Sequence, residues 1–558
     1  MSAARILRSM DFGVMISVAY PMQRNEREAA AAYLGLPGGD GSPRANAFCS
    51  DRSIRLTGGS QASWNGWSPG TANARFQPGG AAALEPNQLQ RLKLKWAFGL
   101  DGDVNAFAPP TILNGNLFVG SAGGFVHALN AETGCIKWIY QADGPVRSAI
   151  LAVESAGRHS LLFGDQIGWF YSIEAETGRL LWKKKIEDHE AARITGSPVA
   201  YQNNVFVPVA SWEETRTLNP DYPCCTFRGS VVALRIGDGS QVWKTYMVPD
   251  RPRLTGKTRV GTATWGPSGA GIWAAPTVDA RRGLLYVTTG DNYSSPATSM
   301  SDAVVALNLS NGRVAWFTQT TPGDAYNSSC GIQGPSCPEE NGPDYDYGSS
   351  ALLLTLSGGR ELVVAGQKSG VVYALDPERR GAIVWQARVG KGGINGGVQW
   401  GMASDGRNIY AAVSDLVRSR RTPDPADPIA VDLDPRAGGG LTALNPGTGD
   451  TEWFAAPIPC ERPRCSPAQS AALTVIPGVV FSGAVDGHLR AFSAEDGKVV
   501  WDFDTVREYE TVNGVRARGG SIDGPGVVVA GGMVFVNSGY SRSGGMAGNV
   551  LLAFAPED

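Results

Sequence analysis

The sequence has no long hydrophobic run, since no stretch reaches the roughly 18 apolar residues that a membrane-spanning helix needs. Charged residues are also scarce at 18%, and the formal net charge is only −3. This weak charge gives no reason to expect nucleic acid or an anionic membrane as a partner. A helical bundle is disfavoured as well, because 72 glycines and 15 tryptophans are typical of short strands and tight turns.

Histidine is rare too, with four residues and no cluster that could bind a metal. We interpret His127, His189 and His488 as structural or surface residues. The eight cysteines therefore predict disulfides rather than a zinc site, above all in the close pairs Cys330/Cys337 and Cys460/Cys465. Disulfides favour an oxidising compartment, although residues 12–22 (FGVMISVAYPM) lack the features of a convincing signal peptide.

The chain changes texture along its length. Residues 1–35 are the one clearly helical part, with Asn25 as N-cap, Glu28 three residues later and Gly35 as the stop. Residues 36–62 are rich in Gly, Ser and Pro and are interpreted as a linker. We expect a helical segment plus linker over residues 1–45 and a separate domain over residues 60–558.

That domain is built from a repeated strand–turn–strand unit whose second strand ends in Trp. The seven complete copies are VHALNAETGCIKW (126–138), FYSIEAETGRLLW (170–182), VVALRIGDGSQVW (231–243), VVALNLSNGRVAW (304–316), VYALDPERRGAIVW (372–385), LTALNPGTGDTEW (441–453) and LRAFSAEDGKVVW (489–501). LKLKWAF (92–98) and VLLAF (550–554) supply the two halves of an eighth unit. The sequence therefore predicts an all-β, eight-bladed β-propeller whose first and last strands share a blade.

The segment from Gly261 to Asn292 holds the first candidate site. Trp273 and Asp291 stand eighteen residues apart, with an apolar strand between them. A flat aromatic ring beside a carboxylate suits a planar, metal-bound ligand, whereas the structural alternative is a buried Trp and an ordinary Gly-Asp turn.

The Trp-ended repeats resemble those of the quinoprotein alcohol dehydrogenases, which are propellers that use pyrroloquinoline quinone (PQQ) and calcium. The resemblance covers residues 60–558, and its motifs are most similar to the polyvinyl alcohol dehydrogenase branch. Those motifs are WNGWSPGTANARFQP (64–78), YPCCTFRGSVVAL (222–234), TGDNYSSP (289–296), GQKSGVVYALDP (366–377) and GGMVFVNSGY (531–540). The resemblance implies a periplasmic enzyme that oxidises secondary alcohols, polyvinyl alcohol included, and passes electrons to a c-type cytochrome.

That branch carries a cytochrome c domain before the propeller, and residues 1–35 resemble only its tail. They hold a Met in the loop Gly13-Val14-Met15 and then a final helix. No CxxCH motif occurs in the chain, so haem c attached through that motif is not expected. We interpret the chain as a truncated form or as one that begins at a late start codon.

The resemblance also assigns site residues. Around the cofactor it places Trp273 as the floor under the quinone, together with Thr195, Arg147 and Gln399. Lys368 is the basic residue that hydrogen-bonds the quinone oxygens. Asp346 is the base that removes the alcohol proton, with Asp344 as the alternative.

For calcium the resemblance assigns Glu213, Asp291 and Asp346, since this ion prefers carboxylate oxygens. Glu214 replaces Glu213 if the register is off by one residue, and Asn292 is the alternative to Asp291.

The adjacent cysteines Cys224-Cys225 depart from the family pattern. Many members place such a pair where this chain has Val146–Ala149, against the quinone. A vicinal disulfide at the cofactor site and separate pairing of each Cys both remain open.

Two other hypotheses are a non-catalytic scaffold of the outer-membrane assembly type and a degenerate product that folds but cannot pass electrons onward. The constellation of Glu213, Asp291, Asp346 and Lys368 favours the enzyme, because a scaffold has no need of these residues at its channel mouth.

Overall fold

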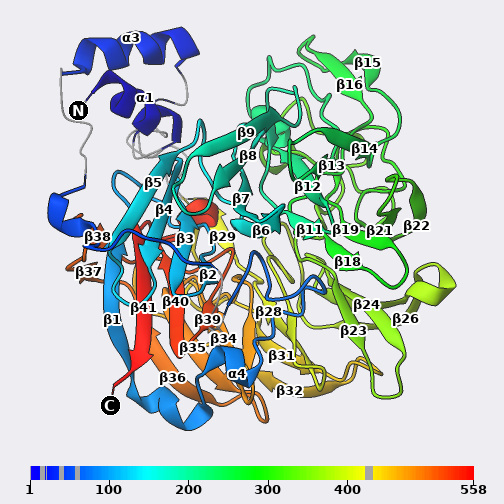
Figure 1. Ribbon diagram of the computed structural model, residues 1–558. Helices are drawn as coiled ribbons and strands as arrows, with labels where there is room; N and C mark the ends of the chain where they lie inside the picture. The colour runs from blue at the N-terminus through cyan, green and yellow to red at the C-terminus, as the bar shows by residue number, and fades with distance from the viewer. Residues whose placement is uncertain are drawn as a thin grey trace.

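The computed structural model describes residues 2–12, 15, 19, 22–36, 43–56, 63–420 and 431–557. In the described residues, seven four-stranded and one five-stranded antiparallel sheets form a ring, so the predicted eight-bladed β-propeller is confirmed (Figure 1). We number the blades in chain order. The strands of each blade are given from the innermost to the outermost.

The first four blades are formed by the following strands. Blade 1 contains β2 (Thr111–Leu113), β3 (Asn116–Gly120), β4 (Phe125–Asn130) and β5 (Ile136–Gln141). Blade 2 contains β6 (Leu151–Ser155), β7 (Arg158–Gly164), β8 (Trp169–Glu174) and β9 (Leu180–Lys185). Blade 3 contains β11 (Val199–Tyr201), β12 (Asn204–Ser211), β13 (Ser230–Arg235) and β14 (Gln241–Tyr246), with β10 (Ala192–Arg193) also paired to β12. Blade 4 contains β18 (Thr277–Asp279), β19 (Leu284–Thr288), β21 (Ala303–Asn308) and β22 (Val314–Gln319).

The other four blades complete the ring. Blade 5 contains β23 (Leu352–Thr355), β24 (Glu361–Gly366), β25 (Val371–Asp376) and β26 (Ala382–Arg388). Blade 6 contains β27 (Ala403–Ser404), β28 (Ile409–Val413), β31 (Gly440–Leu444) and β32 (Thr451–Ala455). Blade 7 contains β33 (Thr474–Ile476), β34 (Val479–Gly483), β35 (His488–Ser493) and β36 (Val499–Asp504). Blade 8 contains β39 (Val528–Ala530), β40 (Met533–Ser538), β41 (Val550–Pro556) and β1 (Leu92–Gly99).

Short elements decorate this ring. Four two-stranded ladders pair β15 (Arg253–Lys257) with β16 (Ala263–Gly266), β17 (Ser268–Gly269) with β20 (Asn292–Ser294), β29 (Arg418–Arg420) with β30 (Val431–Leu433) and β37 (Glu508–Tyr509) with β38 (Ala517–Arg518). The short helical turns are η1 (Ala45–Ala47), α4 (Gly79–Ala82), η2 (Pro86–Arg91), α5 (Glu213–Arg216), η3 (Cys330–Ile332), η4 (Pro377–Arg379) and η5 (Arg542–Gly544).

The repeated Trp joins each blade to the next one. Trp138 on β5 covers Gly178 in the turn of blade 2, and its indole N–H donates to the Ala175 carbonyl at 3.1 Å. A Cβ added to Gly178 would lie 2.8 Å from the Trp138 ring. The turn therefore needs Gly both for its positive φ and for the ring that rests on it. Trp501 at the last junction packs instead on Phe554 of β41, at 5.6 Å between centroids.

The two halves of the eighth unit close the ring as predicted. β1 pairs antiparallel with β41 from Leu92↔Pro556 to Gly99↔Val550, and the two strands lie side by side in Figure 1. Joining the two ends of the propeller in one sheet leaves no open edge between first and last blade.

A second closure was not predicted, because residues 64–77 bind the innermost strands around the ring. Their backbone or side-chain hydrogen bonds join Trp64 to Ile112 (blade 1), Asn65 to Ala152 (blade 2), Asn73 to Thr277 (blade 4), Ala72 to Leu353 (blade 5), Ala74 to Ser404 (blade 6), and Gln77 to Val475 (blade 7) and Val529 (blade 8). We call residues 64–77 the strap.

Arg75 anchors the strap with a fully buried guanidinium group. It donates to the backbone carbonyls of Leu473, Trp67, Pro525 and Val527, and its carbon lies 4.6 Å from the ring centroid of Trp67. Burial lowers the pKa of Arg75 to about 9. Because backbone carbonyls satisfy its donors, this buried cation depends on the strap and the blades being assembled together.

The amino-terminal helices are α1 (Ala3–Phe12) and α3 (Arg24–Leu34), and both lie against one edge of the ring in Figure 1. α3 ends before Gly35 as expected, but its N-cap is Gln23, with Glu26 in the capping box. The predicted cap at Asn25 is therefore wrong by two residues, and Glu28 pairs instead with Arg24 at 2.7 Å. Gly13 and Val14 of the predicted Met loop lie outside the described residues.

Part of the predicted linker is attached to the propeller. Cys49 forms a disulfide with Cys135 of blade 1, and the Lys137 ammonium group donates to the Ser53 carbonyl at 2.8 Å. The Gly- and Ser-rich composition indicated an unattached segment, but it cannot reveal a disulfide partner 86 residues away.

Candidate active site

Three aspartates from neighbouring blades meet in one buried cluster. Asp291 follows β19 of blade 4, while Asp344 and Asp346 lie in the connection from blade 4 to β23 of blade 5. Each offers one carboxylate oxygen, and these three oxygens lie within 4.8 Å of one another. Their residues are only 1%, 5% and 8% exposed. We call Asp291, Asp344 and Asp346 the carboxylate cluster.

Lys368 reaches this cluster from the β24–β25 turn of blade 5. Its Nζ lies 2.6 Å from Asp344 Oδ1 and 3.0 Å from Asp346 Oδ2. Burial alone lowers the pKa of Lys368, but Asp344 and Asp346 outweigh it and raise the pKa well above the usual value. The backbone N–H of Asp291 donates to the other oxygen of Asp346, at 2.6 Å. Both oxygens of Asp346 thus accept a hydrogen bond, one from the Asp291 amide and one from Lys368.

The cluster has more negative charge than its single lysine can balance. Asp291 Oδ2 is buried and has no hydrogen-bond donor. Burial, followed by the charges of Asp346 and Asp344, raises the pKa of Asp291 well above the usual value. An orphaned carboxylate oxygen beside two further carboxylates is the donor set that a hard divalent cation prefers. The residues present therefore fit a calcium ion.

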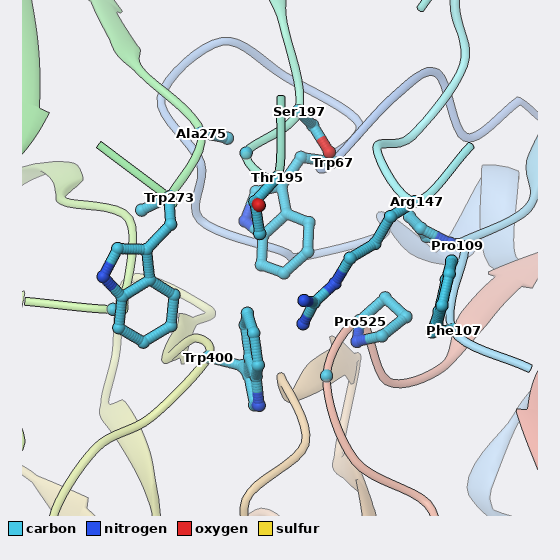
Figure 2. Close-up of a pocket in the computed structure, with 14 residues that line it drawn as sticks. Trp67, Phe107, Pro109, Arg147, Thr195, Ser197, Trp273, Ala275, Trp400 and Pro525 are labelled. Atoms are coloured by element: carbon cyan, nitrogen blue, oxygen red, sulfur yellow. The ribbon is translucent and has the colours of Figure 1, made fainter. Parts of the chain in front are cut away.

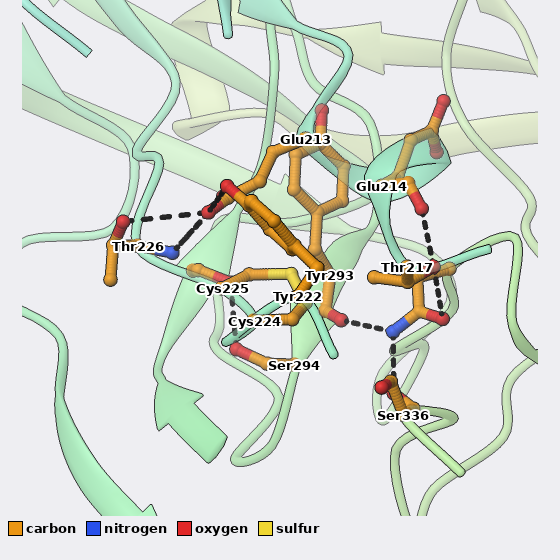
Figure 3. The surroundings of a disulfide bond; sticks show 12 residues. Glu213, Glu214, Thr217, Tyr222, Cys224, Cys225, Thr226, Tyr293, Ser294 and Ser336 are labelled. Carbon is orange, nitrogen blue, oxygen red and sulfur yellow. Dashed lines mark hydrogen bonds between the residues drawn. A yellow bond between two sulfur atoms is a disulfide. The ribbon is translucent and has the colours of Figure 1, made fainter. Parts of the chain in front are cut away.

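The two adjacent glutamates point in opposite directions (Figure 3). The carboxylate of Glu213 accepts hydrogen bonds from the backbone of Thr226 and Phe227, both at 2.8 Å, and from Tyr222 Oη at 3.2 Å. Its lowered pKa depends on His189 and these amides, which offset the cost of burial. The oxygens of Glu213 thus fix the chain after the adjacent cysteines, and its role as a calcium ligand stays a prediction.

Glu214 is the predicted alternative to Glu213. It is partly buried, and removal from solvent together with the charge of Asp346 raises its pKa to about 7, while Lys368 opposes this rise. The charge of Asp346 thus acts on Glu214, and its predicted role as the alternative calcium ligand stays a prediction.

Cys224 and Cys225 form a vicinal disulfide, so of the two alternatives left open by the sequence, separate pairing of each Cys is not the one observed. It lies beside Glu213 and Tyr293 (Figure 3), and it does not line the cavity of Figure 2. The predicted pairs Cys330–Cys337 and Cys460–Cys465 are also confirmed.

An aromatic cavity adjoins the cluster (Figure 2). Trp273 and Trp400 meet edge to face at 4.9 Å and 79°, and Trp67 of the strap lines the same space. Lys368 Nζ lies 5.7 Å from the ring centroid of Trp273, so Trp273 joins the cavity to the cluster. A Cβ on Gly348 would lie 1.9 Å from the Trp273 ring, so the close approach at this position requires glycine.

Arg147 and Thr195 also line this cavity, as their predicted role requires. The Arg147 guanidinium lies 4.5 Å from the Trp400 ring centroid and donates to Tyr540 Oη at 2.7 Å. Trp67, Trp400 and Tyr540 were missed by sequence reasoning, although Trp400 stands directly after the predicted Gln399. A lone Trp carries no signal that separates a cavity wall from the core.

Two predicted residues have other partners. Gln399 Nε2 donates to the Gly396 carbonyl at 2.8 Å, and Gln399 does not line the cavity. Asn292 accepts from the Thr298 amide at 2.6 Å and donates to the Ser268 carbonyl at 2.8 Å. Both ends of its side-chain amide are thus used by Ser268 of β17 and by Thr298, and its role as an alternative ligand stays a prediction.

Comparison with known proteins identifies this combination of fold and site. Residues 64–388 match the family described as "Glucose/ethanol/alcohol dehydrogenase, beta-propeller domain". Polyvinylalcohol dehydrogenase from a Pseudomonas species is 39% identical over 99% of this chain and 89% of its own length. The protein of the same name from Sphingopyxis sp. strain 113P3 is 36% identical over 99% of this chain and 88% of its own length. Among solved structures, quinohemoprotein alcohol dehydrogenase ADHIIG from Pseudomonas putida HK5 matches 91% of this chain and 83% of its own, with TM-score 0.66 and 18% identity.

The scaffold hypothesis has weaker matches. Residues 368–532 and 437–558 match the family of outer membrane assembly factor BamB. The structure of BamB from Moraxella catarrhalis covers 83% of this chain and 99% of its own, with 13% identity and TM-score 0.50, and shows the fold alone. The long matches define an oxidoreductase of the propeller type. The chain belongs to the PQQ-dependent alcohol dehydrogenase family. Within its described residues, no helix is long and apolar enough to cross a membrane.

Proposed function

We propose that this chain oxidises secondary alcohols, polyvinyl alcohol included, to ketones with PQQ and a calcium ion, in the periplasm. The observation that carries this proposal is the carboxylate cluster with its orphaned Asp291 oxygen and its single lysine. The two relatives named polyvinylalcohol dehydrogenase support the substrate class. Four disulfides support an oxidising compartment.

Asp291, Asp346 and Glu214 would hold the calcium ion. All three carboxylates come from loops of adjacent blades, and Asp291 has an oxygen that no protein donor uses. In this assignment Asp344 remains paired with Lys368 at 2.6 Å.

The cofactor would lie against Trp273, within reach of Lys368, with Arg147 and Thr195 at the cavity wall. The ring of Trp273 offers a flat apolar face, and Arg147 offers a cation that is already fixed by Tyr540. PQQ bound there would supply the hydride acceptor for the alcohol carbon, and calcium would supply a Lewis acid.

Asp346 would act as the general base. Hydrogen bonds from Lys368 and the Asp291 amide hold this carboxylate in place, and it would accept the hydroxyl proton of the alcohol. Lys368 also carries a positive charge that balances the deprotonated substrate. Electrons would leave through a c-type cytochrome, in keeping with the family.

Reconstitution tests the proposal. The purified chain is given PQQ and excess calcium, and dye reduction is followed with a secondary alcohol and with polyvinyl alcohol. We expect quinone absorbance on the protein and turnover that chelation abolishes. Bound quinone without turnover of any alcohol, or no bound quinone at all, would contradict the proposed function.

A further inference from the structure

Large apolar side chains are exposed both on the outermost strands of the blades and elsewhere on the propeller. Some lie on outermost strands, such as Val314 on β22 and Ile383 on β26. Another group lies on long loops around the carboxylate cluster. We call this group the mouth rim, and it consists of Leu218, Val260, Ile332, Ile394 and Val417. Each of these residues is between 38% and 57% exposed.

One side of the mouth rim is connected to Glu214. Leu218 follows α5 and stands four residues after Glu214. The Ser328 amide donates to the Glu214 carbonyl at 3.3 Å, which brings in the loop closed by Cys330–Cys337 that carries Ile332.

The β15–β16 hairpin completes this side. Thr262 Oγ1 donates to the Pro220 carbonyl at 2.7 Å, and Arg259 donates to the Gln333 carbonyl at 3.0 Å. Val260 at the hairpin tip is therefore held beside the loops that carry Leu218 and Ile332.

Another part of the mouth rim is connected to Lys368. The Gly393 amide, next to Ile394, donates to the Lys368 carbonyl at 3.2 Å. The Leu416 amide donates to the Asn395 carbonyl at 3.3 Å, so the segment leading through Val417 into β29 adjoins the same loop. The mouth rim thus stands on the loops that also hold Glu214 and Lys368.

We propose that the mouth rim binds the methylene backbone of an extended polyol chain while one of its carbinols reaches the carboxylate cluster. This proposal rests on the proposed function. The aspartates are at most 8% exposed, so the reacting carbinol must pass below the rim. A substrate that also contacts the exposed rim is therefore longer than a single carbinol.

The chemistry of the mouth suits a chain that alternates CH2 with CHOH. Apolar rim side chains bury the methylenes. Arg418 directly follows Val417 at the start of β29 and is exposed, so it offers a polar group beside this part of the mouth rim. An electron-carrier protein is the competing occupant, but it would not need to reach the buried aspartates. The shared loops of rim and cluster favour the substrate.

Rim and control variants of the reconstituted enzyme test this inference. The double variant Val260→Ser/Ile332→Ser is compared with Val314→Ser/Ile383→Ser, which changes exposed apolar residues on outer strands. We expect the rim variant to raise KM for polyvinyl alcohol about tenfold with kcat unchanged, because two apolar contacts are lost. KM for pentane-2,4-diol should stay within about twofold, and the control variant should match the wild type.

A second measurement does not depend on turnover. Calorimetric titration of polyvinyl alcohol into the protein should show the same loss of affinity in the rim variant. Unchanged polymer KM and affinity would overturn the inference, and a slower reaction with a c-type cytochrome in that case would assign the rim to the electron carrier. Wild-type protein that oxidises neither alcohol would contradict the proposed function itself, while polymer binding would still report on the rim.

Discussion

For Glu213 and Glu214, a shift of one residue in the alignment changes which glutamate is expected near the carboxylate cluster. Adjacent residues on a helical turn point about 100° apart, so only one of the two can face the carboxylate cluster. The sequence presents two equal candidates, and α5 begins just where they stand. What separates them is the pair of backbone amides at Thr226 and Phe227, which the fold delivers to Glu213.

Exchanging each glutamate for glutamine should separate their roles. Glu214→Gln should weaken calcium binding at least tenfold and leave the melting temperature without metal near the wild-type value. Glu213→Gln should instead cost about 1–3 kcal/mol of stability, because a buried amide N–H loses its acceptor. Calcium titration and thermal unfolding without metal distinguish the two effects. Loss of calcium binding in a fully stable Glu213→Gln variant would restore the original assignment.

His127 gives a prediction about pH. It is buried on β4 against Phe98, at 5.2 Å between ring centroids, and burial lowers its pKa to about 4. Between pH 4 and 6.5 the unfolded chain therefore binds a proton that the folded chain does not, so stability falls as pH decreases through this range. His127→Leu should remove about 3 kcal/mol of that loss.

Urea unfolding at pH 7.5 and pH 4.5 measures the effect. His159→Gln is the control, because His159 is partly exposed and pairs with Glu176 at 3.0 Å. An unchanged difference between the two pH values in His127→Leu would show that another group causes the acid sensitivity.

At the scale of elements, the contact between Trp and the next turn explains why the repeat can be recognised in the sequence. At every junction but the one after Trp501, a Trp at the end of the second strand rests on a Gly in the following unit's turn, and both are visible in the sequence. The strap left no such signal, because its partners are backbone groups of innermost strands spread along the whole chain. Arg75 looks like any surface arginine until those carbonyls surround it.

Two glycines test the Trp contact separately from backbone strain. Gly178 and Gly157 have nearly equal φ values of 73° and 71°, but only Gly178 faces a Trp ring, while nothing lies within 4 Å of a Cβ on Gly157. Both alanine variants should lose about 1–2 kcal/mol from the left-handed backbone. Gly178→Ala should lose about 1–3 kcal/mol more, because Trp138 must move. Denaturant midpoints that fall equally in both variants would show that packing of Trp138 on Gly178 does not stabilise the fold.

At the scale of the whole molecule, repeats and motifs predict the fold, the enzyme family and most of the cluster. Asp291, Asp346 and Lys368 were foreseen as neighbours although up to 77 residues separate them, since turns of one propeller face meet at its channel. The vicinal disulfide, Trp400 and the choice of glutamate required the folded chain. Those features depend on which way a side chain points, and a local pattern does not determine that.

The central claim is that the carboxylate cluster between blades 4 and 5 is the site of alcohol oxidation, with Asp346 as its base. The most direct measurement is turnover of the complete chain reconstituted with PQQ and calcium, comparing wild type, Asp346→Asn and Asp344→Asn at measured quinone occupancy. Asp346→Asn should retain the quinone and lose about 10²–10⁴ in kcat, since a carboxamide cannot accept the proton. A kcat of Asp346→Asn equal to that of the wild type would contradict the account. If only Asp344→Asn lost activity, the base would be Asp344.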